Sequence, residues 1–312
     1  MNTPSNAVPG SPIDPQGIAS AAVSETRPMY WSVRRELWEN RSLYIAPLAV
    51  AAVVLFGFLI STIGLPHRRR AVLLLNPTQQ RAAIGQPYDM AAVMILATAF
   101  IVGVFYCLDA LHGERRDRSI LFWKSLPVSD LTTVLSKASI PLVVLPLIVF
   151  AIVVATQVDM LLMSNAVLRM NGVAATTGEQ FPFFQQSLIL LYSLTALALW
   201  HAPIYGWLLL VSSWARRATF LWAVLPFAAI SILEKVAFNT SYFGSLLKYR
   251  LIGHVHRAFA FDASGDLHDK VHSLTQLTPE RFLSTPGLWV GLLFAAGFLA
   301  AAVRLRRDRG PI

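Results

Sequence analysis

LYIAPLAVAAVVLFGFLISTI, residues 43–63, is the stretch that decides the fold. It carries no charged side chain, and about 20 mainly apolar residues are enough for a helix to cross a membrane. Five further stretches satisfy the same criterion: 89–111, 131–163, 186–214, 218–238 and 287–303. The sequence therefore predicts an all-α integral membrane protein whose residues 43–305 form a domain of six transmembrane helices. Pro141, Pro146 and Pro203 fall inside these stretches and are expected to kink the helices.

The composition agrees with this prediction. Hydrophobic residues make up 55% of the chain and charged residues 14%, whereas soluble domains have about 25% charged residues. The net charge of +9 comes from Lys and Arg residues that flank the apolar stretches, as signals of membrane orientation do. Membrane lipid is therefore the expected partner, and nucleic acid is not. The single cysteine, Cys107, excludes an intramolecular disulfide and a cysteine zinc site.

The segments before and after the spans have different characters. Residues 1–28 are rich in Pro, Ser, Ala and Gly and read as a disordered tail. In residues 29–42, Tyr30, Trp31, Leu37 and Trp38 recur at helical spacing among charged residues, which predicts an amphipathic helix at the membrane surface. A plain solvated helix is the alternative. Residues 306–312 read as a basic tail.

The placement of Lys and Arg predicts the topology. With both termini in the cytoplasm, most basic residues beside the spans lie on the cytoplasmic side. The segment 239–286 then becomes a long external loop, and a bacterial inner membrane is the expected location. The basic residues 68–70 and Arg81 argue against this orientation, because they would have to cross the membrane.

The most informative segment is the predicted cytoplasmic loop 112–130, which contains GERRDRSILFWKSLPVSD at 113–130. Its pattern predicts a short helix: Glu114 and Asp117 suit a helix N-terminus, and Pro127 forces an end. Ser129 or Asp130 can cap the next helix. The apolar side chains of the loop are too few to span a membrane and too large to leave in water, so we expect them to be buried against lipid, other helices or a partner.

This string, with VLSK following at 134–137, resembles the signature loop of type 2 ABC export permeases. In that family the loop is a coupling helix that docks into a groove on the ATPase subunit. The resemblance implies that nine residues serve ATPase docking here: Glu114, Arg115, Arg116, Asp117, Arg118, Leu121, Leu126, Pro127 and Val128. Phe122 and Trp123 depart from the family pattern, where smaller aliphatic residues are common. A generic interfacial loop is the alternative.

The resemblance also implies partners. Six spans are half of a typical exporter of this kind, so we expect a second copy of this chain and two ATPase subunits. The 312 residues contain no glycine-rich loop ending in Gly-Lys-Ser or Gly-Lys-Thr, which phosphate binding by an ATPase requires. The chain is therefore expected not to be an enzyme by itself and to bind no cofactor, with ATP and Mg²⁺ on the partner subunit.

Other residues are weaker candidates. His201 lies midway along the fourth span, where an ionisable side chain either contacts a transported substrate or makes a structural hydrogen bond. Gly287 and Gly291 form a GxxxG pattern at the start of the sixth span, continued by Ala295, and predict close helix packing. The pairs 254/256 and 268/272 are histidines without supporting cysteines or carboxylates, so we expect no metal site.

Two other functions stay open. A secondary transporter would move its substrate without an ATPase, but no internal repeat is visible. A membrane-embedded enzyme would need converging catalytic groups, yet the sequence has no Gly-x-Ser-x-Gly and no His-Glu-x-x-His motif. A stoichiometric ATPase partner would support the permease, whereas ATP-independent flux would support the secondary transporter.

Overall fold

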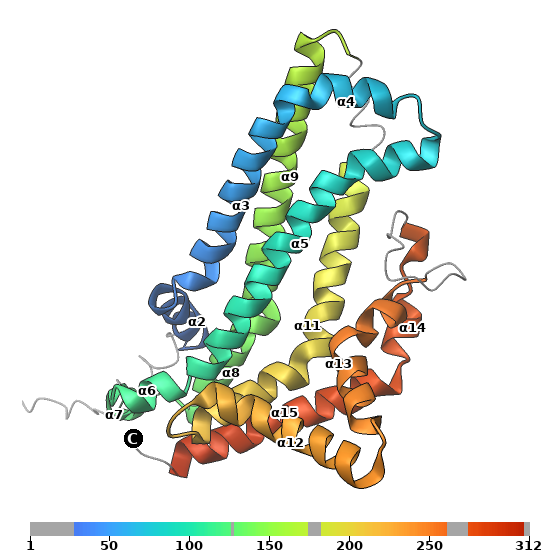
Figure 1. Ribbon diagram of the computed structural model, residues 1–312. Helices are drawn as coiled ribbons and strands as arrows, with labels where there is room; N and C mark the ends of the chain where they lie inside the picture. Colours follow the sequence, from blue (N-terminus) through green and yellow to red (C-terminus); the bar gives the residue numbers. More distant parts are fainter. Residues whose placement is uncertain (1–27, 126–127, 174–181, 261–273, 309–312) are drawn as a thin grey trace, which may run out of the picture.

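The computed structural model describes residues 28–125, 128–173, 182–260 and 274–308, and these residues are almost entirely helical (Figure 1). The α-helices are α2 (Pro28–Glu39), α3 (Ser42–Ser61), α4 (Leu65–Val72), α5 (Pro77–Asp109), α6 (His112–Arg116), α7 (Ser119–Ser125), α8 (Asp130–Ser139), α9 (Leu145–Met170), α11 (Phe183–Trp214), α12 (Thr219–Phe238), α13 (Tyr242–Ala258), α14 (Pro279–Leu283) and α15 (Pro286–Asp308). Short 3₁₀ turns occur at Thr62–Gly64 and Leu274–Gln276, and a π-helical turn at Ile140–Val144 joins α8 to α9.

Six helical stretches in the described part of the chain are long and apolar enough to cross a membrane, which confirms the six predicted spans. They are Ser42–Val72, Gln79–Arg116, Asp130–Met170, Phe183–Trp214, Thr219–Phe238 and Pro286–Asp308. Much of their apolar surface faces outward: on α12 the side chains of Leu233 and Val236 are 69% and 81% exposed. Such surface is costly in water and stable against lipid, so the architecture is that of a multi-pass membrane protein.

Two segments are more helical than the sequence predicted. The helix that contains the second span, α5, begins at Pro77 rather than near residue 89, because the side chain of Asn76 accepts a hydrogen bond from the Gln79 backbone N–H and proline suits the first helical position. The predicted external loop contains the 17-residue α13. Glu234 caps α13 by accepting hydrogen bonds from the backbone N–H groups of Tyr242 and Phe243 at 2.6 and 2.8 Å.

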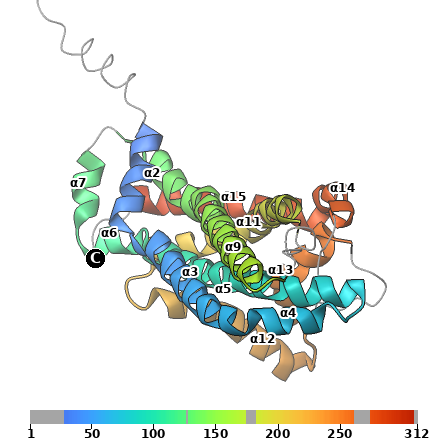
Figure 2. The same cartoon turned by 90° about the horizontal axis from the view of Figure 1, so that it is seen from above.

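The centre of the bundle is α11, which packs against α5, α9, α12, α13 and α15. Its closest approach is to α15, where a Cβ added at Gly206 would lie 3.3 Å from the Cα and the carbonyl oxygen of Ala295. Figure 1 shows α11 bending along its length, and Pro203 lies inside this helix. Seen from above, α3, α5 and α9 lie side by side (Figure 2).

The helices α2, α6 and α7 and the C-terminal end of α15 lie at one end of the molecule, and α4 lies at the other (Figure 1). An even number of spans requires this common end for the first and last described residues. The predicted disordered tail falls outside the described residues except for Pro28, which begins α2. The helix α15 continues into the predicted basic tail as far as Asp308, and the side chain of Arg306 is buried.

Candidate functional site

The predicted coupling loop folds as two short helices rather than one. The chain breaks between α6 and α7 at Arg118, which has φ 58°, a left-handed conformation that ends α6. The Ser129 side chain accepts a hydrogen bond from the Thr132 backbone N–H at 3.0 Å, which confirms Ser129 as the cap of the following helix. Leu126 and Pro127 lie outside the described residues.

Glu114 points into the protein instead of toward solvent. Its side chain is 8% exposed, and Oε1 lies 3.1 Å from Nζ of Lys137, whose side chain is 2% exposed. Arg306 pairs with the other carboxylate oxygen, and Arg35 Nη2 lies 3.2 Å from Oε1. Lys137 Nζ also donates to Glu36 Oε1 at 2.7 Å. Glu114 therefore joins elements that are far apart in the chain.

We call this group the charge cluster; its members are Arg35, Glu36, Glu114, Asp130, Lys137 and Arg306. These six residues are three carboxylates and three cations; a fourth carboxylate, Glu39, lies outside the group, 50% exposed and 3.5 Å from Arg35 Nε. At its margins Tyr106 donates to Glu36 Oε2 at 2.9 Å, and Arg306 Nε lies 3.1 Å from Asp130 Oδ1. Charges buried to this extent are tolerated only when they are paired and hydrogen-bonded. The cluster therefore fixes α2, α6, α8 and α15 relative to one another.

Arg115 holds α6 on the end of α11. Its Nη1 donates to the carbonyl oxygens of Ser213 and Ala215 at 2.7 and 3.4 Å. Ser212 Oγ accepts the backbone N–H groups of Leu111 and His112 at 3.0 and 2.9 Å. Arg115 and Glu114 therefore contact other helices of this chain, and these contacts hold the loop in position.

The surface of the loop is formed mainly by α7. Ile120 is buried, while Leu121 and Phe122 are each 59% exposed. The guanidinium carbon of Arg35 lies 3.8 Å from the centroid of the Trp123 ring, which ties α7 to the charge cluster. Lys124 Nζ donates to the Arg307 carbonyl at 3.2 Å. In both views α7 lies at the periphery of the molecule (Figures 1 and 2).

The charged residues beside α7 are exposed. Arg116 forms ion pairs with Asp109 at 3.5 Å and Asp117 at 3.0 Å, and more than half of each side chain is accessible. Arg118 is exposed and Val128 is half-buried. The loop therefore has two parts: an inner part, Glu114 and Arg115, that binds the bundle, and an outer part that is exposed.

His201 is 3% exposed and satisfied within its own helix. Its Nδ1 lies 2.9 Å from the Leu197 carbonyl oxygen, and its ring packs against Phe100 and His254 with centroids 5.8 and 5.3 Å apart. Burial, and then the charge of nearby His201, lowers the pKa of His254 to about 4, so that His254 is neutral at pH 7.

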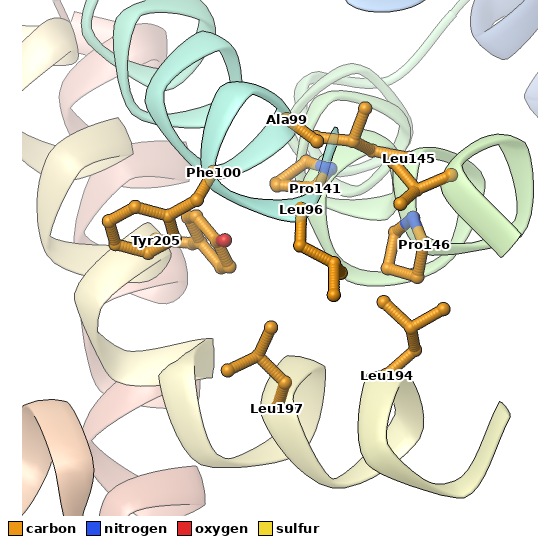
Figure 3. A pocket seen from close by; sticks show the side chains of 10 residues that line it. Leu96, Ala99, Phe100, Pro141, Leu145, Pro146, Leu194, Leu197 and Tyr205 are labelled. Atoms are coloured by element: carbon orange, nitrogen blue, oxygen red, sulfur yellow. The ribbon is translucent and has the colours of Figure 1, made fainter. Parts of the chain in front are cut away.

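An apolar cavity of about 30 Å³ lies beside this region, between α5, the π-helical turn, α9 and α11 (Figure 3). It is lined by Leu96, Ala99, Phe100, Pro141, Leu145, Pro146, Val149, Leu194, Leu197 and Tyr205. Ligand pockets have volumes of about 300 Å³ or more, so this cavity is too small for an organic substrate in this conformation.

The small face of α15 is used within the chain. A Cβ at Gly287 would lie 2.7 Å from the Tyr249 hydroxyl, and one at Gly291 would overlap the guanidinium of Arg250. Ala295 packs against Gly206 of α11. Close packing at Gly287 and Gly291 is thus present, but against side chains of α13. No group of three potential metal ligands occurs among the described residues, and positions 268 and 272 lie outside them.

Sequence reasoning missed the partners of Glu114. In the sequence, Lys137 and Glu36 stand out as charged residues beside apolar stretches. They pair with each other, but 101 positions separate them, so the sequence did not predict the pairing. Comparisons with protein-family models, with curated proteins and with solved structures find no match.

Proposed function

We propose that this chain is the permease subunit of an ATP-driven exporter in a bacterial inner membrane. A separate ATPase subunit docks on α7. The observation that carries the proposal is that the exposed apolar helix α7 packs on Arg35 of the charge cluster. The same buried cluster contains residues of three membrane-spanning segments. The resemblance of residues 114–130 to the coupling loop of type 2 ABC export permeases supports it.

In this proposal the outer part of the loop meets the ATPase. Leu121 and Phe122 supply an apolar contact, and Arg116 and Arg118 flank it with positive charge. Apolar anchors at the centre of a contact with charges at its rim are typical of protein interfaces. ATP and Mg²⁺ bind the partner, and this chain supplies the path through the membrane.

The inner part of the loop, through Glu114 in the charge cluster, transmits a movement of the docked ATPase to the membrane-spanning helices. A displacement of α7 acts on Arg35 through Trp123 and thereby on the charge cluster. Separating buried paired charges is costly, so the cluster moves as a unit. Lys137 lies on α8, which leads directly into the π-helical turn Ile140–Val144 beside the apolar cavity. Turns of this kind are frequent at functional sites in helices.

The proposed assembly contains two copies of this chain with their termini in the cytoplasm. Each copy contributes six spans, and the exposed apolar surface of α12 faces either lipid or the second copy.

The test is to purify the full chain from the membranes of the cells that naturally produce it. The purified sample is then assayed for Mg-ATP hydrolysis by proteins that co-elute with the chain. Wild type is expected to carry hydrolysis, and Leu121→Glu is expected to lose it because a carboxylate replaces an apolar contact. Leu74→Glu is the matched control, since Leu74 is 88% exposed and follows α4 at the other end of the molecule (Figure 1).

Undiminished hydrolysis with Leu121→Glu would refute docking on α7. Absence of hydrolysis from wild-type preparations that still transport substrate down an ion gradient would instead favour a secondary transporter.

A further inference from the structure

Arg250, on α13, is a cation held between α11 and α15. Its guanidinium carbon lies 4.9 Å from the centroid of the Trp200 ring. Its Nη1 donates to the Gly287 carbonyl oxygen at 3.0 Å, and the Trp200 indole N–H donates to the Arg250 carbonyl at 2.9 Å. These contacts place the guanidinium against the first turns of α15.

The hydrogen bonding of this guanidinium is incomplete. Its Nε and Nη2 are buried and have no hydrogen-bond partner, and no carboxylate within the described ranges forms an ion pair with Arg250. An arginine side chain stays charged at every physiological pH and offers five N–H donors. Buried donors without acceptors are rare in folded proteins and indicate a missing partner.

The guanidinium fills a groove that glycine creates. A Cβ at Gly291 would overlap its Nη2, and the overlapping atoms are the far end of a flexible side chain. Arg250 is only half-buried as a residue, so a rotation of its side chain carries the N–H groups out of the groove. His254 lies one helical turn further along α13, and its ring contacts His201.

The groove lies at the beginning of the sixth candidate span, where a spanning helix is expected to enter the headgroup region. Gly287 and Gly291 lie in the first two turns of the sixth span, which starts at Pro286. Trp289, between them, is 56% exposed, and tryptophan is enriched where membrane meets water. The anionic groups at this depth are phosphates and carboxylates of amphiphilic molecules.

We propose that Arg250 binds a phosphate or carboxylate oxygen at this depth, and that the groove at Gly287 and Gly291 holds its guanidinium while the site is empty. The aromatic face of Trp200 forms one wall of the site. The anion belongs either to a membrane lipid or to a soluble molecule. The proposal does not depend on an ATPase partner.

Native mass spectrometry of the full chain in detergent tests it with two probes, phosphatidylglycerol and inorganic phosphate. Arg250→Gln is expected to weaken binding of the preferred probe by about tenfold or more, since a charge-assisted hydrogen bond is lost. Lys248→Gln removes the same charge from an exposed position on the same helix and is expected to bind as wild type does. Preference for phosphatidylglycerol assigns a lipid, and preference for inorganic phosphate assigns a soluble anion.

Gly291→Ala separates this role from a structural one, because it keeps the guanidinium but closes the groove. Binding at least as tight as in wild type supports the proposal, even if Arg250→Gln cannot be purified. Weaker binding in Gly291→Ala, wild-type binding in Arg250→Gln, or no binding of either probe by wild type would overturn it.

Discussion

At position 206 the chain has no side chain, and the backbone of Ala295 occupies the adjacent space. The same shape complementarity recurs at Gly291, where the space is taken by Arg250. Sequence spacing indicated a small face on the sixth span, because small residues let helices approach closely. The spacing did not predict which residue packs against each glycine, because a glycine indicates only that some group lies close to it.

Gly206→Val is expected to destabilise the fold by about 1–3 kcal/mol, because the backbone it meets has no freedom to yield. Thermal unfolding in detergent measures the change. Gly297→Val is the control, since a Cβ at that position of α15 meets nothing within 4 Å. Equal losses in the two variants would show that α11 and α15 are not constrained at this contact.

At the scale of elements, charged side chains lock the ends of α2, α6, α8 and α15 together. The apolar stretches predicted the helices that cross the membrane, since length and hydropathy determine that signal. The polar beginning of α5 and the amphipathic α13 lack the signal, so the sequence underestimated both. The sequence did not predict the charge cluster for another reason, because four of its ion pairs join residues 79 to 192 positions apart.

Lys137→Met is expected to cost about 3–5 kcal/mol, because it leaves Glu36 and Glu114 buried with excess negative charge. Chemical unfolding in detergent measures the loss. Adding Glu36→Gln to Lys137→Met is expected to recover part of it, since one of the unpaired carboxylates is then removed. Lys248→Met is the exposed control. No recovery in the double variant would contradict the pairing.

At the scale of the whole molecule, the six spans place alternate connections on opposite sides of the membrane. The helix α7 and both described ends of the chain share one end of the molecule (Figure 1). The sequence predicted the number of spans well, because each is a local property. Orientation was less accessible, since the arginines of α4 lie at the opposite end from the other basic clusters.

Cysteines introduced for Ser125 in α7 and Ser245 in α13 are expected to react with a membrane-impermeant maleimide from opposite faces of vesicles. Both positions are exposed, and an odd number of spans separates them. The native Cys107 is 0% exposed and is expected to react only after unfolding, so it serves as the internal control. Labelling of both introduced cysteines from the same face would refute the topology.

The charge cluster is completed late in the synthesis of the chain. Glu114 is synthesised 192 residues before Arg306, its partner on α15. While the ribosome is still working, the carboxylates therefore outnumber the cations available to them, and the described cluster reaches neutrality only when Arg306 emerges. A chain cut short before that point keeps an unbalanced charge beside its first three spans. Truncation before residue 306 is therefore expected to leave Glu114 and Asp130 without this cation.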